Sequence, residues 1–126
     1  MQNNWRILVI EDDPDGQEVV STILDHLNIP MDVASDAEEA EVWLFDEGVM
    51  YDAIILDLAL PGKDGWTLLN EILSDEATAN IPCVAITAYH SSKTREEALK
   101  AGFASYFPKP IDATTFARHL ESLLQG

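Results

Sequence analysis

Residues 7–14 read Ile-Leu-Val-Ile-Glu-Asp-Asp-Pro, a continuous apolar run that ends in three acidic residues and a proline. A strand with one solvent-facing side alternates apolar and polar residues, whereas a continuous apolar run is typical of a strand covered on both faces. Four further short, mainly apolar runs follow along the chain, at 31–34, 53–56, 83–86 and 106–107. The chain is therefore predicted to form five strands in a sheet with both faces covered.

Longer amphipathic stretches separate these runs and predict five helices. Pro14 suits the first turn of the first helix, and Asp36 forms a plausible capping box with the glutamate three residues later. The fourth helix is expected over about 92–101 with a stop at Gly102, and the fifth is expected to start after a cap at Asp112. The apolar residues at helical spacing are Val19, Val20, Ile23, Leu24, Leu27, Ala40, Trp43, Leu44, Trp66, Leu69, Ile72, Leu73, Phe116, Leu120, Leu123 and Leu124.

Strands that alternate with helices along a chain form a parallel sheet with helices packed on both faces, so the predicted fold class is α/β, a doubly wound sheet of five βα units. Because the crossovers are right-handed, only a few doubly wound strand orders remain open. Sites in such sheets form at the carboxyl ends of the strands, beside the point where the strand order reverses. The residues that directly follow each apolar run are therefore the candidates for function.

Length and composition limit the class of protein. The chain has 126 residues, which predicts a single domain over 1–126. Lys and Arg total 7 against 23 Asp and Glu, a formal net charge of −16, so neither nucleic acid nor an anionic membrane surface is an expected partner. The single cysteine, Cys83, cannot form an internal disulfide. Residues 1–5 lack the layout of a signal peptide, and we expect a cytoplasmic location.

The residues at the ends of the apolar runs carry charges and hydroxyls that can act together. They are Glu11, Asp12 and Asp13 after the first run, Asp57 after the third, Thr87 after the fourth, and Lys109 with Pro110 after the fifth. Carboxylates that converge from two strands are typical ligands of Mg²⁺, and without a cation they would repel one another. With the metal bound, Asp57 can attack phosphorus, while the incoming oxygens go to Mg²⁺, Lys109 and Thr87. Taken alone, an acidic triplet is more often the solvated start of a helix.

Four motifs occur together and in a fixed order along the chain. They are Val9-Ile10-Glu11-Asp12-Asp13-Pro14; Ile55-Leu56-Asp57-Leu58 followed by Pro61 and Asp64-Gly65; Ile86-Thr87-Ala88; and Lys109-Pro110. In this combination the chain, from Ile7 to about Leu124, resembles the receiver domain of bacterial two-component response regulators, and in particular the chemotaxis-type, stand-alone single-domain regulators. The resemblance implies a flavodoxin-like strand order, 2-1-3-4-5.

The resemblance also implies which residues hold the metal. Asp57 would be the phosphoacceptor and a metal ligand, and Asp12 a direct Mg²⁺ ligand. Glu11 would act mainly through metal-bound water, and the backbone carbonyl of Ala59 would be a further ligand. Asp13, the extra member of the triplet, is expected to point away from the site.

The same resemblance implies a phosphate-binding and switching set. Thr87 and Lys109 would contact the phosphoryl oxygens, and the Lys109–Pro110 peptide bond is expected to be cis. Tyr106 matches the aromatic residue whose ring swings inward as Thr87 moves toward the phosphate. Thr87 and Tyr106 are therefore the expected switch.

Several residues fall outside these patterns. Ala59 and Tyr89 depart from the commonest residues at two positions that tune the lifetime of the phosphate in this family. The three histidines, His26, His90 and His119, have no carboxylate partners at ligand spacing in the sequence, and we interpret all three as surface residues.

The leading hypothesis is a phosphorylation switch, without a turnover substrate, that receives a phosphoryl group from a histidine kinase or a histidine phosphotransfer protein. Its output would be protein contacts or phosphate relay, since no residues remain for an output domain after the fifth helix. One alternative is a receiver excised from a larger hybrid kinase or regulator. Another is a Mg²⁺-dependent phosphohydrolase with an aspartate nucleophile, but such enzymes carry a second aspartate where this chain has Ala59. A flavodoxin-like electron carrier would need a hydroxyl-rich loop in place of the acidic triplet, and a phosphate-independent interaction module would not need the acceptor set.

Overall fold

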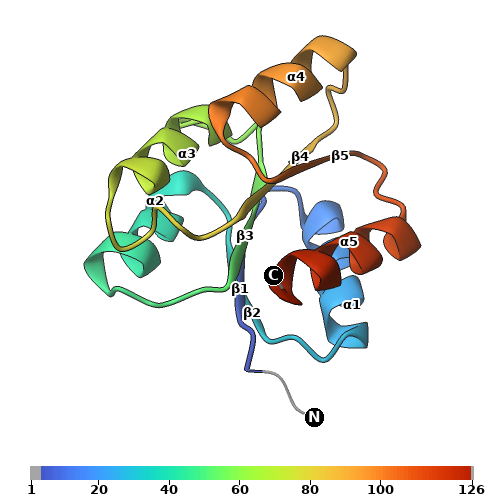
Figure 1. Ribbon diagram of the computed structural model, residues 1–126, viewed down its shortest axis with the longest axis horizontal. Helices are drawn as coiled ribbons and strands as arrows, with labels where there is room; N and C mark the ends of the chain where they lie inside the picture. The colour runs from blue at the N-terminus through green and yellow to red at the C-terminus, as the bar shows by residue number, and fades with distance from the viewer. Residues whose placement is uncertain (1–3, 126) are drawn as a thin grey trace.

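The fold is a five-stranded parallel sheet between two layers of helices (Figure 1). The computed structural model describes residues 4–125. Of residues 1–5, which lack the layout of a signal peptide, the first three lie outside the described part. The strands are β1 (Ile7–Ile10), β2 (Met31–Ala34), β3 (Ala53–Asp57), β4 (Cys83–Thr87) and β5 (Ser105–Pro108). Their order is β2-β1-β3-β4-β5, which confirms the α/β class and the expected strand order.

Helices cover both faces of this sheet. They are α1 (Pro14–His26), α2 (Ala37–Glu41), the π-helix η1 (Val42–Asp46), α3 (Gly65–Ser74), α4 (Ser92–Ala101) and α5 (Ala113–Gln125). Figure 1 shows α1 and α5 on one side of the sheet, with α2, α3 and α4 on the other. Among the described residues, no helix combines the length and the apolar character needed to cross a bilayer.

The two helical layers explain why the strands are apolar along their whole length. Alternate residues of β1 enter opposite cores: Leu8 and Ile10 face α2, α3 and α4, whereas Ile7 and Val9 face α1 and α5. All four side chains are fully buried. Because side chains of a strand alternate between its two faces, a strand enclosed on both sides must be apolar at every position.

Side-chain caps begin the helices where the sequence predicted them. The carboxylate of Asp36 accepts the amide hydrogen of Glu39 at 2.8 Å, and Asp112 accepts that of Thr115 at 3.0 Å. Helix α4 ends at Gly102, whose φ of 121° lies in a region that residues with a Cβ rarely adopt.

The second predicted helix differs from the expectation in its second half. It is α-helical only over α2 and continues as η1, in which the amide of Glu47 donates to the carbonyl of Val42 at 2.8 Å. The wider π turn still buries Leu44 and packs Trp43 against the core. Apolar spacing did not reveal this change, because positions 40, 43 and 44 share one face in either type of helix.

A polar cluster at the amino ends of the strands joins three segments of the chain. Asp32 of β2 accepts a hydrogen bond from the buried Tyr51 hydroxyl at 2.8 Å and pairs with the Arg6 guanidinium at 2.6 Å. The guanidinium also lies 5.8 Å from the centre of the Tyr51 ring. Burial, followed by the hydrogen bond to Asp32, raises the pKa of the Tyr51 phenol above its usual value.

We expect Asp32→Ala to lower the free energy of unfolding by about 1–3 kcal/mol, since it leaves the buried Tyr51 hydroxyl without its partner. Chemical denaturation at pH 7 measures this difference. Asp46→Ala, which removes an exposed carboxylate from η1, is the matched control for the change in net charge. An equal loss in the two variants would show that the hydroxyl does not depend on Asp32.

Candidate functional site

The carboxyl ends of the strands bring the predicted site residues to one edge of the sheet. Asp57 is the last residue of β3 and stands beside Ile86 of β4, so that Thr87 extends one residue further at the same edge. Lys109 follows β5, and its amide donates to the carbonyl of Thr87 at 2.8 Å. The sequence-based expectation that these residues converge is confirmed.

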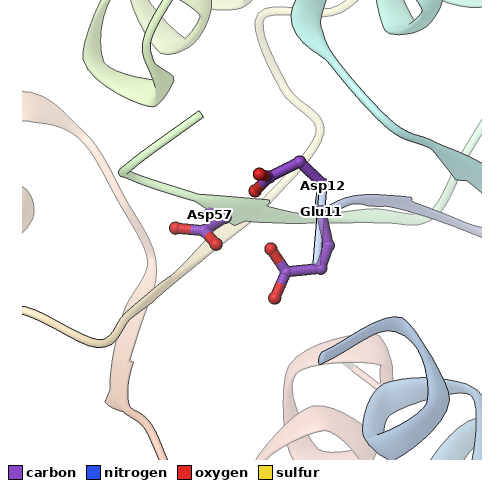
Figure 2. A group of neighbouring side chains, drawn as sticks. All are labelled: Glu11, Asp12 and Asp57. Atoms are coloured by element: carbon purple, nitrogen blue, oxygen red, sulfur yellow. The ribbon is translucent and has the colours of Figure 1, made fainter. Parts of the chain in front are cut away.

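Three carboxylates form a candidate cation site at this edge. One oxygen from each of Glu11, Asp12 and Asp57 lies within 4.8 Å of the other two. Figure 2 shows the side chains gathered around a common space, with Asp57 reaching it from β3 and the other two from the end of β1. Glu11 and Asp57 are buried, whereas Asp12 is exposed.

The third acidic residue of the triplet has a different position. Asp13 caps α1, and its carboxylate accepts the amide hydrogen of Asp15 at 3.2 Å. This side chain is exposed and does not belong to the cluster of three carboxylates. The expectation that Asp13 points away from the cation site agrees with this geometry.

The Glu11 side chain is the most deeply buried member of the site. Its Oε1 pairs with the Lys109 ammonium, whereas its Oε2 is buried without a hydrogen-bond partner among the described residues. A buried carboxylate oxygen without a partner is costly. This oxygen, together with the all-carboxylate composition of the cluster, fits a hard cation such as Mg²⁺.

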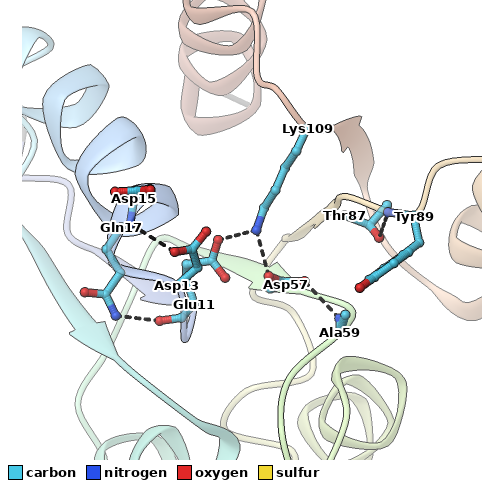
Figure 3. A network of polar contacts seen from close by, with 9 residues as sticks. All are labelled: Glu11, Asp13, Asp15, Gln17, Asp57, Ala59, Thr87, Tyr89 and Lys109. Atoms are coloured by element: carbon cyan, nitrogen blue, oxygen red, sulfur yellow. Dashed lines mark hydrogen bonds and ion pairs between the residues drawn. The ribbon is translucent and has the colours of Figure 1, made fainter.

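Both oxygens of the Asp57 carboxylate have partners. Its Oδ1 accepts the amide hydrogen of Ala59 at 2.8 Å, and its Oδ2 pairs with Lys109 at 2.9 Å. Figure 3 shows the lysine extending from the end of β5 to a point between Asp57 and Glu11. One ammonium group thus joins two carboxylates, one at the end of β3 and one directly after β1.

The buried pair of carboxyl groups divides its charge unequally. Burial is the largest cause that raises the pKa of Glu11 to about 8, and the neighbouring Asp57 adds to this rise while Lys109 opposes it. Burial alone would raise the pKa of Asp57, but the neighbouring Glu11, the ammonium of Lys109 and the amide of Ala59 together hold it below its ordinary value. Without a metal ion, the negative charge of this pair therefore lies mainly on Asp57.

The loop after Asp57 packs tightly against the end of β3. The amide of Gly65 donates to the carbonyl of Leu58 at 3.2 Å. A Cβ on Gly65 would lie 2.5 Å from the carbonyl oxygen of Asp57, so only glycine fits this approach. This contact holds the segment that contains Ala59 against the site.

The two expected switch residues are both buried. The Thr87 hydroxyl accepts the amide hydrogen of Tyr89 at 3.0 Å. The Tyr106 ring is 7% exposed and already packs in the core beneath α3 and α4. Its hydroxyl lies 2.9 Å from Nδ1 of His90, a bond that sequence reasoning missed because the two residues come from different loops and strands. The Tyr106 ring is thus already buried in this structure.

The predictions for Pro110, for the three histidines and for the cysteine agree with the structure. The Lys109–Pro110 peptide bond is cis. The three histidines are exposed, although His119 is bonded to the Ser105 hydroxyl at 2.6 Å. Cys83 is buried and unpaired. A groove of about 550 Å³ between α1 and α5 lies away from the acidic edge, and the described residues that line it include only one carboxylate, that of Glu121.

Fold and site together define an α/β domain with flavodoxin-like strand order and a carboxylate cluster at the carboxyl edge of its sheet. Residues 7–121 match the family model of the response regulator receiver domain. The chain therefore belongs to the response regulator receiver domain family.

Two relatives are similar to this chain over nearly its whole length. An uncharacterized 14.6 kDa protein in the sodA1 3′ region of Leptolyngbya boryana is 32% identical, with 89% of this chain and 84% of that protein covered. The DNA-binding dual master transcriptional regulator RpaA of Synechocystis is 31% identical over 95% of this chain, but the match covers only 49% of RpaA. The chain thus spans about half the length of that regulator.

Solved structures show the same architecture. The receiver domain of sensor histidine kinase PA1611 from Pseudomonas aeruginosa is 31% identical, with a TM-score of 0.87 and coverage of 98% of this chain and 100% of that one. That structure has a magnesium ion coordinated in its active site cleft. A putative response regulator from Chloroflexus aurantiacus superposes with a TM-score of 0.90 over 98% of this chain and 100% of that one, and at 24% identity it shows the fold alone.

Proposed function

We propose that the chain is a phosphorylation switch of a two-component system, in which Asp57 accepts a phosphoryl group from a phosphohistidine of a histidine kinase or a histidine phosphotransfer protein. The observation that carries the proposal is the position of Asp57. Its carboxylate has a lowered pKa and pairs with Lys109, and it belongs to the same carboxylate cluster as Glu11.

The transfer needs an ionised nucleophile and neutralisation of the incoming charge. As a new bond forms between an Asp57 oxygen and phosphorus, the phosphorus–nitrogen bond of the donor breaks and the imidazole nitrogen keeps the electron pair. The low pKa of Asp57 keeps the nucleophile deprotonated. Lys109 is already at the site to bind a phosphoryl oxygen, and we assign a second oxygen to the Thr87 hydroxyl.

The metal would be held by Glu11, Asp12, Asp57 and the backbone carbonyl of Ala59. Bound Mg²⁺ would supply positive charge to the phosphoryl oxygens. The magnesium ion in the PA1611 receiver domain supports this choice of metal. In this chain, the unpartnered Oε2 of Glu11 supports a role for that side chain at the metal site.

We propose a switch without a turnover substrate, because Ala59 offers no side-chain acid or base for hydrolysis of the phosphorylated Asp57. Output would pass through contacts with another protein or through phosphate relay, in the cytoplasm, with the chain acting as one receiver domain over 1–126. A second candidate is a receiver within a longer protein, which is favoured by the match to only about half of RpaA.

The test is labelling with a small phosphodonor. We expect one phosphoryl group per chain in the presence of Mg²⁺, measured as a mass increase of the intact protein. Chelation of the metal before the donor is added should prevent the increase. An equal yield in chelator would contradict the Mg²⁺-dependent transfer.

The acidic triplet allows a separate prediction about the metal. Asp12→Ala should weaken Mg²⁺ binding by about tenfold or more, because it removes a carboxylate of the cluster. Asp13→Ala, which removes the same charge from the cap of α1, should change the affinity by less than about twofold. Calorimetric titration with Mg²⁺ measures both values. Equal losses of Mg²⁺ affinity in the two variants would show that Asp12 and Asp13 do not have the different roles assigned to them.

A further inference from the structure

Helix α1 passes directly beneath the Glu11 side chain at Gly16. A Cβ on Gly16 would lie 2.0 Å from Oε1 of Glu11, 2.8 Å from its Cδ and 3.1 Å from its Cγ. Contacts under 3.0 Å are essentially never made by real Cβ atoms. The Glu11 carboxylate therefore occupies the space that any side chain at position 16 would take.

The backbone gives no reason for glycine at this position. Gly16 lies inside α1, and it is not among the residues with positive φ. Glycine is also less favourable than alanine within a helix. The close approach of Glu11 is the feature that requires a residue without a Cβ.

The same approach determines where the Glu11 carboxylate points. From its place above Gly16, Oε1 pairs with Lys109, and one carboxylate oxygen stays within 4.8 Å of the ligand atoms of Asp12 and Asp57. Because the Glu11 side chain is fully buried, a displaced carboxylate would have to move within the packed interior of the site rather than out into solvent.

An aspartate at position 11 would need less of this space. Its carboxyl carbon would correspond to Cγ of Glu11, which lies 3.1 Å from the Cβ position on residue 16, and one of its oxygens would correspond to Cδ, which lies 2.8 Å from that position. Contacts at 2.8 and 3.1 Å require a shift of a few tenths of an ångström, whereas the contact at 2.0 Å requires a much larger shift of the Glu11 carboxylate.

We propose that Gly16 is a positioning residue for Glu11: the missing side chain at position 16 lets glutamate, rather than the shorter aspartate, serve as the inner acidic residue of the metal site. Gly16 acts only through Glu11, and the two positions function as a pair. The proposal rests on the proposed Mg²⁺ site.

A double-mutant cycle tests this pairing. Gly16→Ala should weaken Mg²⁺ binding by about tenfold or more when residue 11 is glutamate, and by less than about twofold when Glu11→Asp is also present. Calorimetric titrations of the four proteins at pH 8 measure the affinities. Ser21→Ala, on the exposed part of the same helix, is the control for a change in helix propensity. Equal fold-changes in the two backgrounds, or no change in either, would overturn the proposal.

Thermal melting without metal gives a second, independent readout. Alanine in place of glycine within a helix stabilises the folded protein when the space is free. We therefore expect Gly16→Ala to raise the melting temperature in the Glu11→Asp background and to raise it less, or lower it, in the wild-type background. The same shift in both backgrounds would overturn the role of Gly16. Failure of the wild-type protein to bind Mg²⁺ would instead contradict the proposed function, and the melting comparison would still decide the pairing.

Discussion

Asp57→Asn is expected to abolish phosphorylation by a small phosphodonor in the presence of Mg²⁺. An asparagine amide keeps the size of the side chain but has no anionic oxygen to attack phosphorus. The other groups of the site, including Lys109 and Glu11, remain in place. Intact-protein mass spectrometry after incubation with the donor measures the loss, which should be complete.

The control for this experiment is Asp13→Asn. It removes a carboxylate from the same edge of the sheet, and asparagine is an equally good residue at the start of a helix. We expect this variant to accept one phosphoryl group, as the wild type does. Labelling of the Asp57→Asn protein at the wild-type level would place the acceptor elsewhere and remove the basis of the proposed function.

Glu11 is expected to make the metal-free protein less stable as the pH rises. Its pKa is raised from 4.5 to about 8 in the folded state, so the folded protein holds a proton there that the unfolded chain has released. This contribution to stability is complete below pH 4.5 and is lost as the pH rises through about 8. The lowered pKa of Asp57 acts in the opposite direction, but only below its ordinary value of 3.8.

Glu11→Gln should prevent this loss of stability at high pH, because a neutral amide carries no buried charge at any pH. In metal-free buffer the variant should be more stable than the wild type at pH 8 by on the order of a few kcal/mol, and the difference should shrink toward pH 5. Melting temperatures measured from pH 5 to pH 8 test this trend. Glu18→Gln, an exposed change of the same type on α1, should follow the wild type. A parallel pH profile for Glu11→Gln and wild type would show that Glu11 titrates normally.

The strands and the edge of the sheet that carries the site were predictable from the sequence for a local reason. A strand covered on both faces is apolar at every position, so 7–10 and 53–56 could be recognised without any knowledge of their neighbours. The caps at Asp36 and Asp112 act on amides three residues away. Contacts over so few residues can be recognised from the order of the residues in the sequence.

The internal organisation of the site was less predictable. The sequence placed Glu11 and Asp12 side by side, but one is fully buried and the other is exposed. The bond between His90 and Tyr106 joins residues from two segments whose distance depends on how α4 and β5 pack. Neither feature has a signal in residue spacing, because both depend on elements that are distant in the chain.

By itself, the sequence determined the order of strands and helices, the edge of the sheet where the acidic residues and Lys109 meet, and the family to which the motifs belong. Only the tertiary structure decided that Glu11 carries the raised pKa, that Gly16 provides the space for its carboxylate, and that Tyr106 lies inward. The physical reason is the distance along the chain over which each feature is determined. Periodicity and capping depend on backbone geometry over a few residues, whereas burial, charge coupling and steric fit depend on side chains from separate elements that approach within a few ångströms only when the helices pack on the sheet.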